Sequence, residues 1–134
     1  MSMDRETLIA PIVASVRKGT CYSRGEIMRA MATWTLFPIL VDGQHVGTLA
    51  CKGTEVHVAL VEGWRPRGSY RGLIRYMLEP LFAVHGFLTT KLRMGDHLKE
   101  HEFVTRLGFR KTWSDGDFQY YLLGAMPFEK RMKS

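Results

Sequence analysis

The stretch that decides the fold is residues 55–74, which read EVHVALVEGWRPRGSYRGLI. Residues 55–61 are mainly β-branched or apolar and therefore predict a strand. A loop rich in Gly and Arg follows, and from Leu73 onward apolar residues recur every three or four positions, which predicts a helix. The chain is thus expected to run from a strand through an arginine-rich loop into a helix N-terminus.

The loop between that strand and that helix has the chemistry of an anion site. Backbone N–H groups at a helix N-terminus lack intrahelical partners, and the helix dipole makes this end positive. A phosphate or pyrophosphate group is well accommodated there. Arg65, Arg67 and Arg71 would add charge-assisted contacts. The loop alone is equally compatible with an ordinary, solvent-exposed connection.

A first helix is predicted near the N-terminus. Asp4 stands just ahead of apolar residues at helical spacing, and Gly19 provides a C-terminal cap. Pro11 fits only near the first turn of a helix, because it lacks the backbone N–H that a later position needs. We therefore expect the regular helix to begin around Ala10.

A second helix and two strands complete the N-terminal half. Ser23 and Glu26 form a Ser-x-x-Glu capping box, which marks a short helix ending near Trp34. The pattern then changes to β-branched and apolar runs at residues 35–41 and 45–52, joined by an Asp-Gly turn. With the strand of the opening stretch, they predict a three-stranded antiparallel meander.

The C-terminal half continues with alternating elements. The helix after the loop stops at a His-Gly pair, residues 87–92 read as a strand, and a further helix runs from its cap Asp96 to Gly108. Residues 109–114 and 118–123 form a hairpin around an Asp-Gly-Asp turn. The predicted order is helix, helix, three strands, helix, strand, helix, two strands, which is an α+β fold.

Composition indicates one domain. A chain of 134 residues with 46% hydrophobic residues suits a single core, which we assign to residues 1–124, followed by a basic tail at residues 125–134. Lys and Arg number 19 against 13 Asp and Glu, so the net charge of +6 favours acidic partners without choosing among them.

Cysteine usage and hydropathy indicate the compartment. Cys21 and Cys51 are far apart and lack a partner at zinc-ligand spacing, so we expect no disulfide framework and no metal site, but two buried, reduced thiols. No run approaches the roughly 18 apolar residues of a membrane span, and no signal peptide is recognisable. We expect a soluble cytoplasmic protein.

The element order and two short motifs resemble the GNAT acetyltransferases. In that family the third antiparallel strand leads into a phosphate-binding loop with the pattern Arg/Gln-x-x-Gly-x-Gly/Ala. Here that position reads Arg67-Gly68-Ser69-Tyr70-Arg71-Gly72. Residues 103–109, FVTRLGF, are similar to the family's helix-to-strand junction ending in Leu-Gly-Phe. Together these features cover roughly residues 20–123.

The resemblance implies a fold, an activity and a co-substrate. It implies a mixed, mostly antiparallel central sheet flanked by helices, and transfer of an acetyl group from acetyl-CoA to a primary amine on a small molecule or protein. Backbone groups from Val58 to Val61 would meet the pantetheine arm. The implied contacts to the coenzyme phosphates are Arg65, Arg67, Gly68, Ser69, Tyr70, Arg71 and Gly72.

The chain departs from the family pattern at three positions. Tyr70 replaces the middle glycine of the loop, which normally lets backbone and phosphate approach closely. Val104 stands where the family often has a tyrosine general acid, and His97 stands where an asparagine is common. These departures resemble small GNAT-like proteins of bacteriophages, including an internal virion protein. A non-catalytic protein associated with other phage or virion proteins is therefore the alternative function.

Three residues are candidate catalytic bases. Acetyl transfer requires the amine to lose a proton, and in the family an acidic residue on the third antiparallel strand often accepts it. Glu55 and His57 alternate on one face of that strand, and Glu62 follows its end. The alternatives are a partly buried, hydrogen-bonded strand histidine for His57 and solvated strand-end charges for both glutamates.

For the remaining histidines, tyrosines and tryptophans, the sequence favours structural roles over catalytic or ligand-binding ones. His97 and His101 have zinc-compatible spacing but no third ligand, so His101 is assigned to the polar face of its helix. Of the adjacent Tyr120 and Tyr121, one ring is expected in the core and one outside, with a hydroxyl available to a substrate. Trp64 is read either as a packing residue or as a contact to the adenine or the pantetheine arm. Trp34 and Trp113 are read as packing residues.

The sequence bears on two further classes of partner, nucleic acid and a second copy of the chain. A nucleic-acid-binding module is disfavoured, because the linear sequence shows neither an aromatic-basic stripe nor a recognition-helix pattern. The edge of the final hairpin would allow a homodimer by strand pairing. The acceptor amine is not encoded in any motif.

Overall fold

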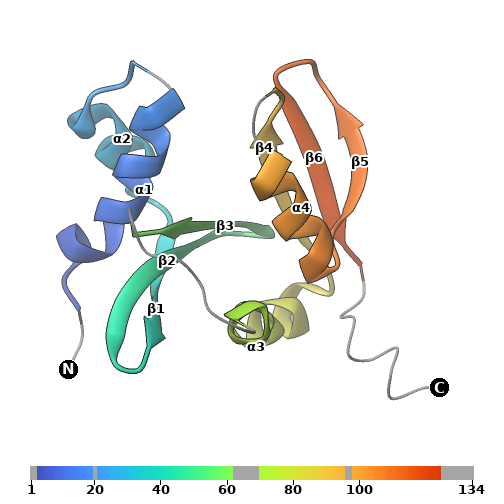
Figure 1. Cartoon of the computed structure of the whole chain (residues 1–134), viewed down its shortest axis with the longest axis horizontal. Coiled ribbons are helices and arrows are strands. Elements are labelled where there is room, and N and C mark those ends of the chain that lie inside the picture. Colours follow the sequence, from blue (N-terminus) through green and yellow to red (C-terminus); the bar gives the residue numbers. More distant parts are fainter. Residues whose placement is uncertain (1–2, 20, 62–69, 96–97, 125–134) are drawn as a thin grey trace. The chain divides into compact units, whose positions relative to one another are not determined.

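The computed structural model describes residues 3–19, 21–61, 70–95 and 98–124 (Figure 1). Its helices and strands follow the order expected from the sequence, which is confirmed. The elements are α1 (Arg5–Gly19), α2 (Arg24–Ala30), β1 (Thr35–Val41), β2 (Gln44–Lys52), β3 (Glu55–Leu60), α3 (Tyr70–His85), β4 (Leu88–Arg93), α4 (Leu98–Leu107), β5 (Arg110–Ser114) and β6 (Phe118–Leu123).

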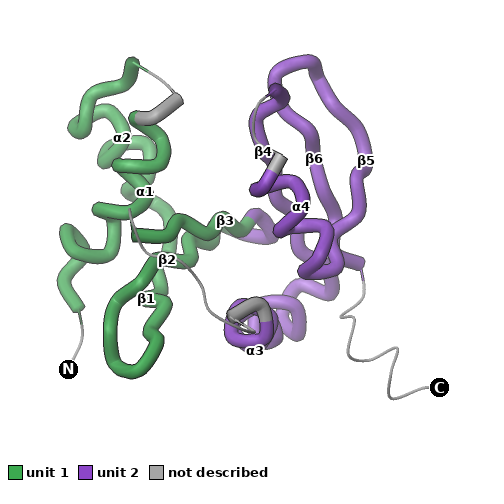
Figure 2. Tube along the Cα trace, in the orientation of Figure 1, with its two compact units in different colours: residues 1–52, 56–65 green, residues 53–55, 66–134 purple. Residues whose placement is uncertain are grey.

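The strands form a six-stranded sheet in the order β1-β2-β3-β4-β6-β5. The pairs β1–β2, β4–β6 and β5–β6 are antiparallel, and β3 pairs in parallel with β4 through Glu55 and Thr89. The expected mixed, mostly antiparallel sheet is therefore confirmed. By contacts the chain divides into two compact units, residues 1–52 with 56–65 and residues 53–55 with 66–134 (Figure 2).

In the first unit, α1 begins earlier than the sequence suggested. The Asp4 carboxylate accepts a hydrogen bond from the Thr7 amide at 2.8 Å, and the Leu8 amide donates to the Asp4 carbonyl at 3.1 Å. These bonds start the helix at Arg5, so Pro11 lies inside it and the expected start around Ala10 is wrong. Pro11 removes one backbone donor only, and burial of the surrounding apolar residues outweighs that loss.

The start of α2 was predicted correctly. The Glu26 amide donates to Ser23 Oγ, and the Ser23 amide donates to the Glu26 carboxylate, both at 3.2 Å, which completes the capping box. The helix ends at Ala30, four residues before the expected end, and Trp34 instead packs against the core. One buried hydrophobic cluster of this unit consists of Ile9, Ile12, Val13, Ile27, Ala50 and Ala59.

Two details fix the meander of this unit. Asp42 and Gly43 both have positive φ, 52° and 78°, as a type I′ hairpin turn requires between β1 and β2. On β2, Gly47 lies so close to β3 that a Cβ there would meet the Ala59 carbonyl oxygen at 2.7 Å. The glycine therefore allows the two strands to approach.

The cysteines differ from expectation in one respect. Neither is in a disulfide, and Cys51 is buried, which raises the pKa of its thiol above the ordinary 9.0. Cys21 is exposed, so its expected burial is wrong. It lies two residues ahead of the Ser23 cap, where residues 21–23 are all exposed.

In the second unit, one face of β4 and β6 is buried, and the described residues of the other face are half-buried or exposed. Leu88 and Thr90 pair with Leu123 and Tyr121, and all four are buried. α3 contacts β4 and α4, and the Arg75 guanidinium of α3 donates to the carbonyl of Arg106 at 2.5 Å. Residues of opposite parity on these strands point to the other face, which none of these contacts cover.

Candidate functional site

Most of the expected phosphate loop lies outside the described residues. This holds for Arg65, Arg67, Gly68 and Ser69, and the candidate base Glu62 also lies outside the described residues. α3 begins at Tyr70, so the helix N-terminus does fall on the motif, with the backbone of Tyr70, Arg71 and Gly72 in its first turn.

Gly72 is the part of the motif whose surroundings are visible. It is exposed in the first turn of α3, and a Cβ built on it would meet no atom within 4 Å. Glycine inside a helix costs roughly 0.5–1 kcal/mol relative to alanine. Among the described residues, neither packing nor a positive φ requires a glycine at this position.

The two residues expected to contact pantetheine, Val58 and Val61, differ in where their backbone N–H groups point. The Val61 amide donates to the Val46 carbonyl of β2 at 2.8 Å, so this N–H group is already engaged. Successive residues in a strand direct their N–H groups to opposite edges. The N–H of Val58, three residues earlier, therefore points away from β2.

Glu55 and His57 are half-buried residues of β3, two positions apart, so both side chains point to the same face of that strand. The His57 ring contacts the Trp34 ring, with centroids 5.5 Å apart and planes tilted by 54°. Glu55 stands opposite Thr89 in the parallel pair and acts electrostatically on Tyr120. The structure describes these two candidate bases but not Glu62.

A polar cluster that the sequence did not predict surrounds Tyr120. Its hydroxyl donates to Asp115 Oδ2 at 3.0 Å, while Asp115 Oδ1 accepts from the amides of Asp117 at 3.0 Å and Phe118 at 2.8 Å. The bond to Asp115 is the main reason that the pKa of Tyr120 is raised above 10.0, followed by burial and by the charges of Asp115, Glu55 and Asp117. The backbone bond from Phe118 is the main reason that the pKa of Asp115 is lowered from 3.8.

Tyr121 has a different partner on the buried face. Its hydroxyl lies 2.5 Å from Nδ1 of His101, and Nε2 of His101 lies 3.0 Å from the Arg93 carbonyl. A carbonyl can only accept, so Nε2 carries the proton and Nδ1 accepts from Tyr121. Burial raises the pKa of Tyr121. The expected division of the two tyrosines, one inward and one outward, is confirmed, but the inward hydroxyl is engaged within the core.

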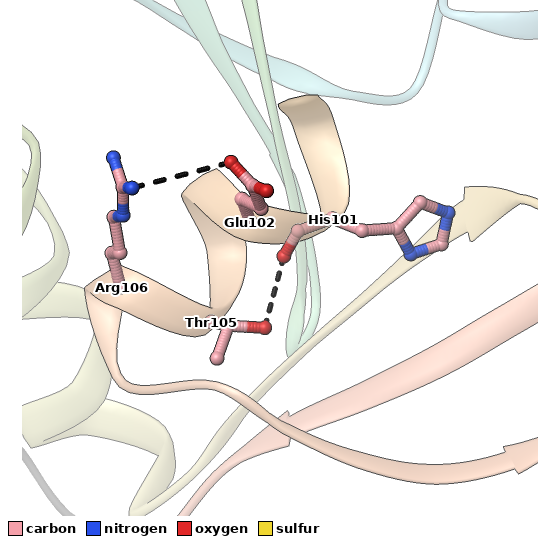
Figure 3. A network of polar contacts seen from close by, with 4 residues as sticks. All are labelled: His101, Glu102, Thr105 and Arg106. Carbon is pink, nitrogen blue, oxygen red and sulfur yellow. Dashed lines mark hydrogen bonds and ion pairs between the residues drawn. The ribbon is translucent and has the colours of Figure 1, made fainter. Parts of the chain in front are cut away.

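His101 therefore does not belong to the polar face of α4, as the sequence suggested. Figure 3 shows its ring projecting on the side opposite to the ion pair of Glu102 and Arg106, whose atoms are 4.0 Å apart. The Thr105 hydroxyl donates to the His101 carbonyl at 2.9 Å. The helical spacing gave the position, but only the contact with Tyr121 shows which way the imidazole faces.

Trp113 was expected to pack inside and does not. It is 58% exposed on β5, where it stacks on the Tyr120 ring. By contrast, Val104, which replaces the family's tyrosine acid, is buried in α4. Among the described residues no group of three or more His, Cys, Asp or Glu side chains is arranged to hold a metal ion, and none of the described helices is long and apolar enough to span a membrane.

Comparisons with known proteins find structural relatives only. No protein-family model and no curated protein sequence matches the chain. Among solved structures, an acetyltransferase from Agrobacterium tumefaciens matches with a TM-score of 0.67 and 16% identity, over 91% of this chain and 86% of that chain. Campylobacter jejuni N-acetyltransferase PseH in complex with acetyl coenzyme A matches with a TM-score of 0.61 and 16% identity, over 91% and 92%.

A third match names the family. A GNAT family acetyltransferase from Elizabethkingia anophelis, with acetyl-CoA bound, matches with a TM-score of 0.57 and 13% identity, over 75% of this chain and 82% of that chain. At such identities the likeness establishes the fold, and the expected GNAT-like fold is confirmed. The bacteriophage-type resemblance finds no support in these comparisons.

Proposed function

We propose that this GNAT-fold chain is an N-acetyltransferase that transfers the acetyl group of acetyl-CoA to a primary amine. The observation that carries the proposal is the fold match over about nine-tenths of both chains to an N-acetyltransferase with acetyl coenzyme A bound. The start of α3 on the Arg67–Gly72 motif supports the same conclusion, because a helix N-terminus suits a pyrophosphate.

The coenzyme contacts follow from the motif and from β3. The pyrophosphate would lie on the backbone amides of residues 68–72, with Arg65, Arg67 and Arg71 neutralising its charge. Gly72, open to solvent and without a packing role, leaves room for the phosphate. Val58 supplies the backbone contact to pantetheine, since the Val61 amide is bonded to β2.

The reaction needs one base and one site for the leaving thiolate. The amine nitrogen loses a proton, attacks the thioester carbonyl carbon, and forms the C–N bond as the C–S bond breaks; coenzyme A leaves as a thiolate that takes up a proton. Val104 offers no proton, and the Tyr120 hydroxyl is committed to Asp115 with a raised pKa. The thiolate is therefore protonated from solvent in this proposal.

Glu55 is the base that the surroundings favour over His57. The His57 ring packs against Trp34, which suits a structural histidine. Glu55 is half-buried on a strand position that the family often uses for this task, and Glu62 remains the third candidate. The variants Glu55→Gln, His57→Gln and Glu62→Gln separate them, because only loss of the base removes the rise of the rate on the acidic side of the pH profile while leaving coenzyme affinity intact.

Calorimetry with acetyl-CoA and an assay for released thiol test the proposal directly. We expect saturable binding and slow thiol release that a primary amine, offered as a panel of small amines and peptide N-termini, accelerates. Absence of binding at about 1 mM coenzyme, which corresponds to a free energy of about −4 kcal/mol, rules the proposal out. The dissociation constant of desulfo-CoA, which lacks the sulfur that carries the acetyl group, measures coenzyme binding without the transfer reaction.

A non-catalytic role is the second candidate. Tyr70 and Val104 stand where the family has residues useful for binding and proton transfer, and this favours a retained scaffold, for example in a virion. Folded protein that neither binds acetyl-CoA nor releases thiol would support it. Turnover above the background of the buffer excludes a purely structural role.

A further inference from the structure

The open face of the second unit carries aromatic and cationic side chains from three strands. Lys91 and Arg93 of β4 pair with Tyr120 and Phe118 of β6 and so share their face. Trp113 of β5 joins them by stacking on Tyr120, and Arg110 stands opposite Leu122, two residues from Tyr120. We call these six residues, Lys91, Arg93, Arg110, Trp113, Phe118 and Tyr120, the open sheet face.

The rings of the open sheet face are arranged for stacking. Trp113 and Tyr120 are nearly parallel, with centroids 4.3 Å apart and planes 7° from parallel, and Trp113 remains 58% exposed. Its outer surface is thus available to a further planar ring. The Lys91 ammonium lies 4.8 Å from the centroid of the Phe118 ring and the Arg93 guanidinium 6.0 Å, so two cations stand beside the aromatic surface.

The stack is held in place before any ligand arrives. The Tyr120 hydroxyl is bonded to Asp115, whose carboxylate is itself held by the amides of Asp117 and Phe118. The Gln119 side chain donates to the Trp113 carbonyl at 3.1 Å. A pre-organised aromatic surface loses little conformational freedom on binding, so more of the stacking energy appears as affinity.

We propose that the open sheet face binds single-stranded nucleic acid, with a base stacked on Trp113 and phosphates on Lys91, Arg93 and Arg110. Sites for single-stranded nucleic acid combine aromatic rings, on which bases stack, with cations that contact the phosphates. The chain also carries a net charge of +6. Three carboxylates also act on this face: Asp115, which is engaged by three donors, and Asp117 and Glu55, whose charges act on Tyr120. The function is independent of acetyl transfer.

The same residues explain why the linear sequence did not suggest this partner. Trp113 and Tyr120 stand seven positions apart and the two β4 cations lie at least twenty positions upstream, so no stripe exists until β4, β6 and β5 are paired. A single strand rather than a duplex fits, because bases must be unpaired to lie on an aromatic ring of a sheet surface.

Fluorescence anisotropy with a labelled oligo-dT of roughly 15 nucleotides tests the proposal. Three phosphate contacts predict a decrease in affinity of about twentyfold between about 50 mM and about 200 mM salt. Trp113→Ala should weaken binding by about fivefold to a hundredfold without changing that salt dependence. Lys91→Gln should reduce the slope of log affinity against log salt by about 0.7.

Matched controls separate a site from general attraction. Tyr76→Ala removes a ring that is 70% exposed on α3, away from the sheet, and Lys99→Gln removes an exposed cation from α4. Neither should alter affinity by more than about twofold. Thermal unfolding by circular dichroism confirms that each variant is folded.

Several outcomes overturn the proposal. One is absence of binding up to about 100 µM protein at low salt. Another is an equal loss for Trp113→Ala and Tyr76→Ala. A third is equal affinity for the single strand and for a duplex of the same length. A fourth is displacement of the oligonucleotide by heparin to the same extent in the wild type and in Trp113→Ala. Both indicate attraction by charge alone. None of these outcomes bears on acetyl-CoA binding.

Discussion

The indole of Trp113 lies flat on the phenol ring of Tyr120, with ring centroids 4.3 Å apart and planes 7° from parallel. The two residues stand on neighbouring strands of the last hairpin, and a register irregularity between Lys111 and Ser114 brings the indole over the ring. The hydroxyl end of the same tyrosine is bonded to the Asp115 carboxylate in the hairpin turn. The Tyr120 side chain therefore contacts both the hairpin turn, through its hydroxyl, and the indole of Trp113, through its ring.

The ionised Asp115 carboxylate should stabilise the hairpin, and this stabilisation should be lost in strong acid. Its pKa is lowered from 3.8, chiefly by the backbone bond from Phe118, so the stabilisation is present above 3.8 and is lost as pH falls through the lowered value. A carboxyl carbon titration by NMR should give a midpoint below 3.8 for Asp115. In Tyr120→Phe, which removes one donor, the midpoint should move upward; a wild-type midpoint at or above 3.8 contradicts the assigned bonds.

Gly47→Ala should destabilise the fold. The new Cβ would lie 2.7 Å from the Ala59 carbonyl oxygen and 2.9 Å from a Leu60 methyl, and the backbone oxygen cannot move without opening the β2–β3 pair. We expect a loss of about 1–3 kcal/mol in the free energy of unfolding, measured with urea.

Gly25→Ala provides the matched control for this overpacking. A Cβ on Gly25 meets nothing closer than the flexible end of Arg29, at 3.7 Å, so the change should raise stability by up to about 1 kcal/mol through helix propensity. Equal effects of Gly47→Ala and Gly25→Ala on the urea midpoint would show that the strand approach is not as close as described.

Tyr121→Phe should cost more stability than Tyr120→Phe. The first change leaves Nδ1 of the half-buried His101 without its donor, and we expect part of the cost of about 1–3 kcal/mol that a fully buried unsatisfied acceptor carries. The second removes a bond at the exposed turn, where water replaces the lost partner. Urea unfolding of both variants measures the difference, and similar midpoints would contradict the inward role of Tyr121.

Gly72→Ala should separate coenzyme binding from stability. A Cβ at this position meets no atom of the described residues outside its own helix turn within 4 Å, so the helix should gain up to about 1 kcal/mol. If a pyrophosphate lies against this turn, the same methyl group should weaken acetyl-CoA binding, by about tenfold or more. Calorimetry and thermal unfolding on one sample report both effects; higher stability with unchanged binding would place the phosphate elsewhere.

Tyr70→Gly should strengthen acetyl-CoA binding. It restores glycine at the position where the GNAT phosphate loop has it, so the backbone and the phosphate can approach without an intervening side chain. Calorimetry against the wild type measures the change. Tyr76→Ala, also on α3 but exposed outside the motif, is the control that should leave binding unaltered.

Sequence patterns predicted elements best where the signal was local. The Ser23–Glu26 box, the Asp-Gly hairpin and the alternating runs of β1 and β6 involve residues close in the chain, so short-range chemistry identifies them. The start of α1 was missed because burial of its apolar side outweighs the lost donor of Pro11, a balance that depends on tertiary packing. For the candidate site, the sequence placed Glu55 and His57 on one strand face and Gly72 at a helix start, but it did not predict the contact between His57 and Trp34.

The sequence by itself determined the order of elements, the turns and the position of the Arg67–Gly72 motif, since propensity, capping and hydrophobic period act within a few residues. Only the tertiary structure decided that Tyr121 bonds His101 while Tyr120 bonds Asp115, and that Trp113 lies outside beside Lys91 and Arg93. Strand pairing brings together residues from distant parts of the chain, and the face each one joins depends on register, which no local pattern specifies.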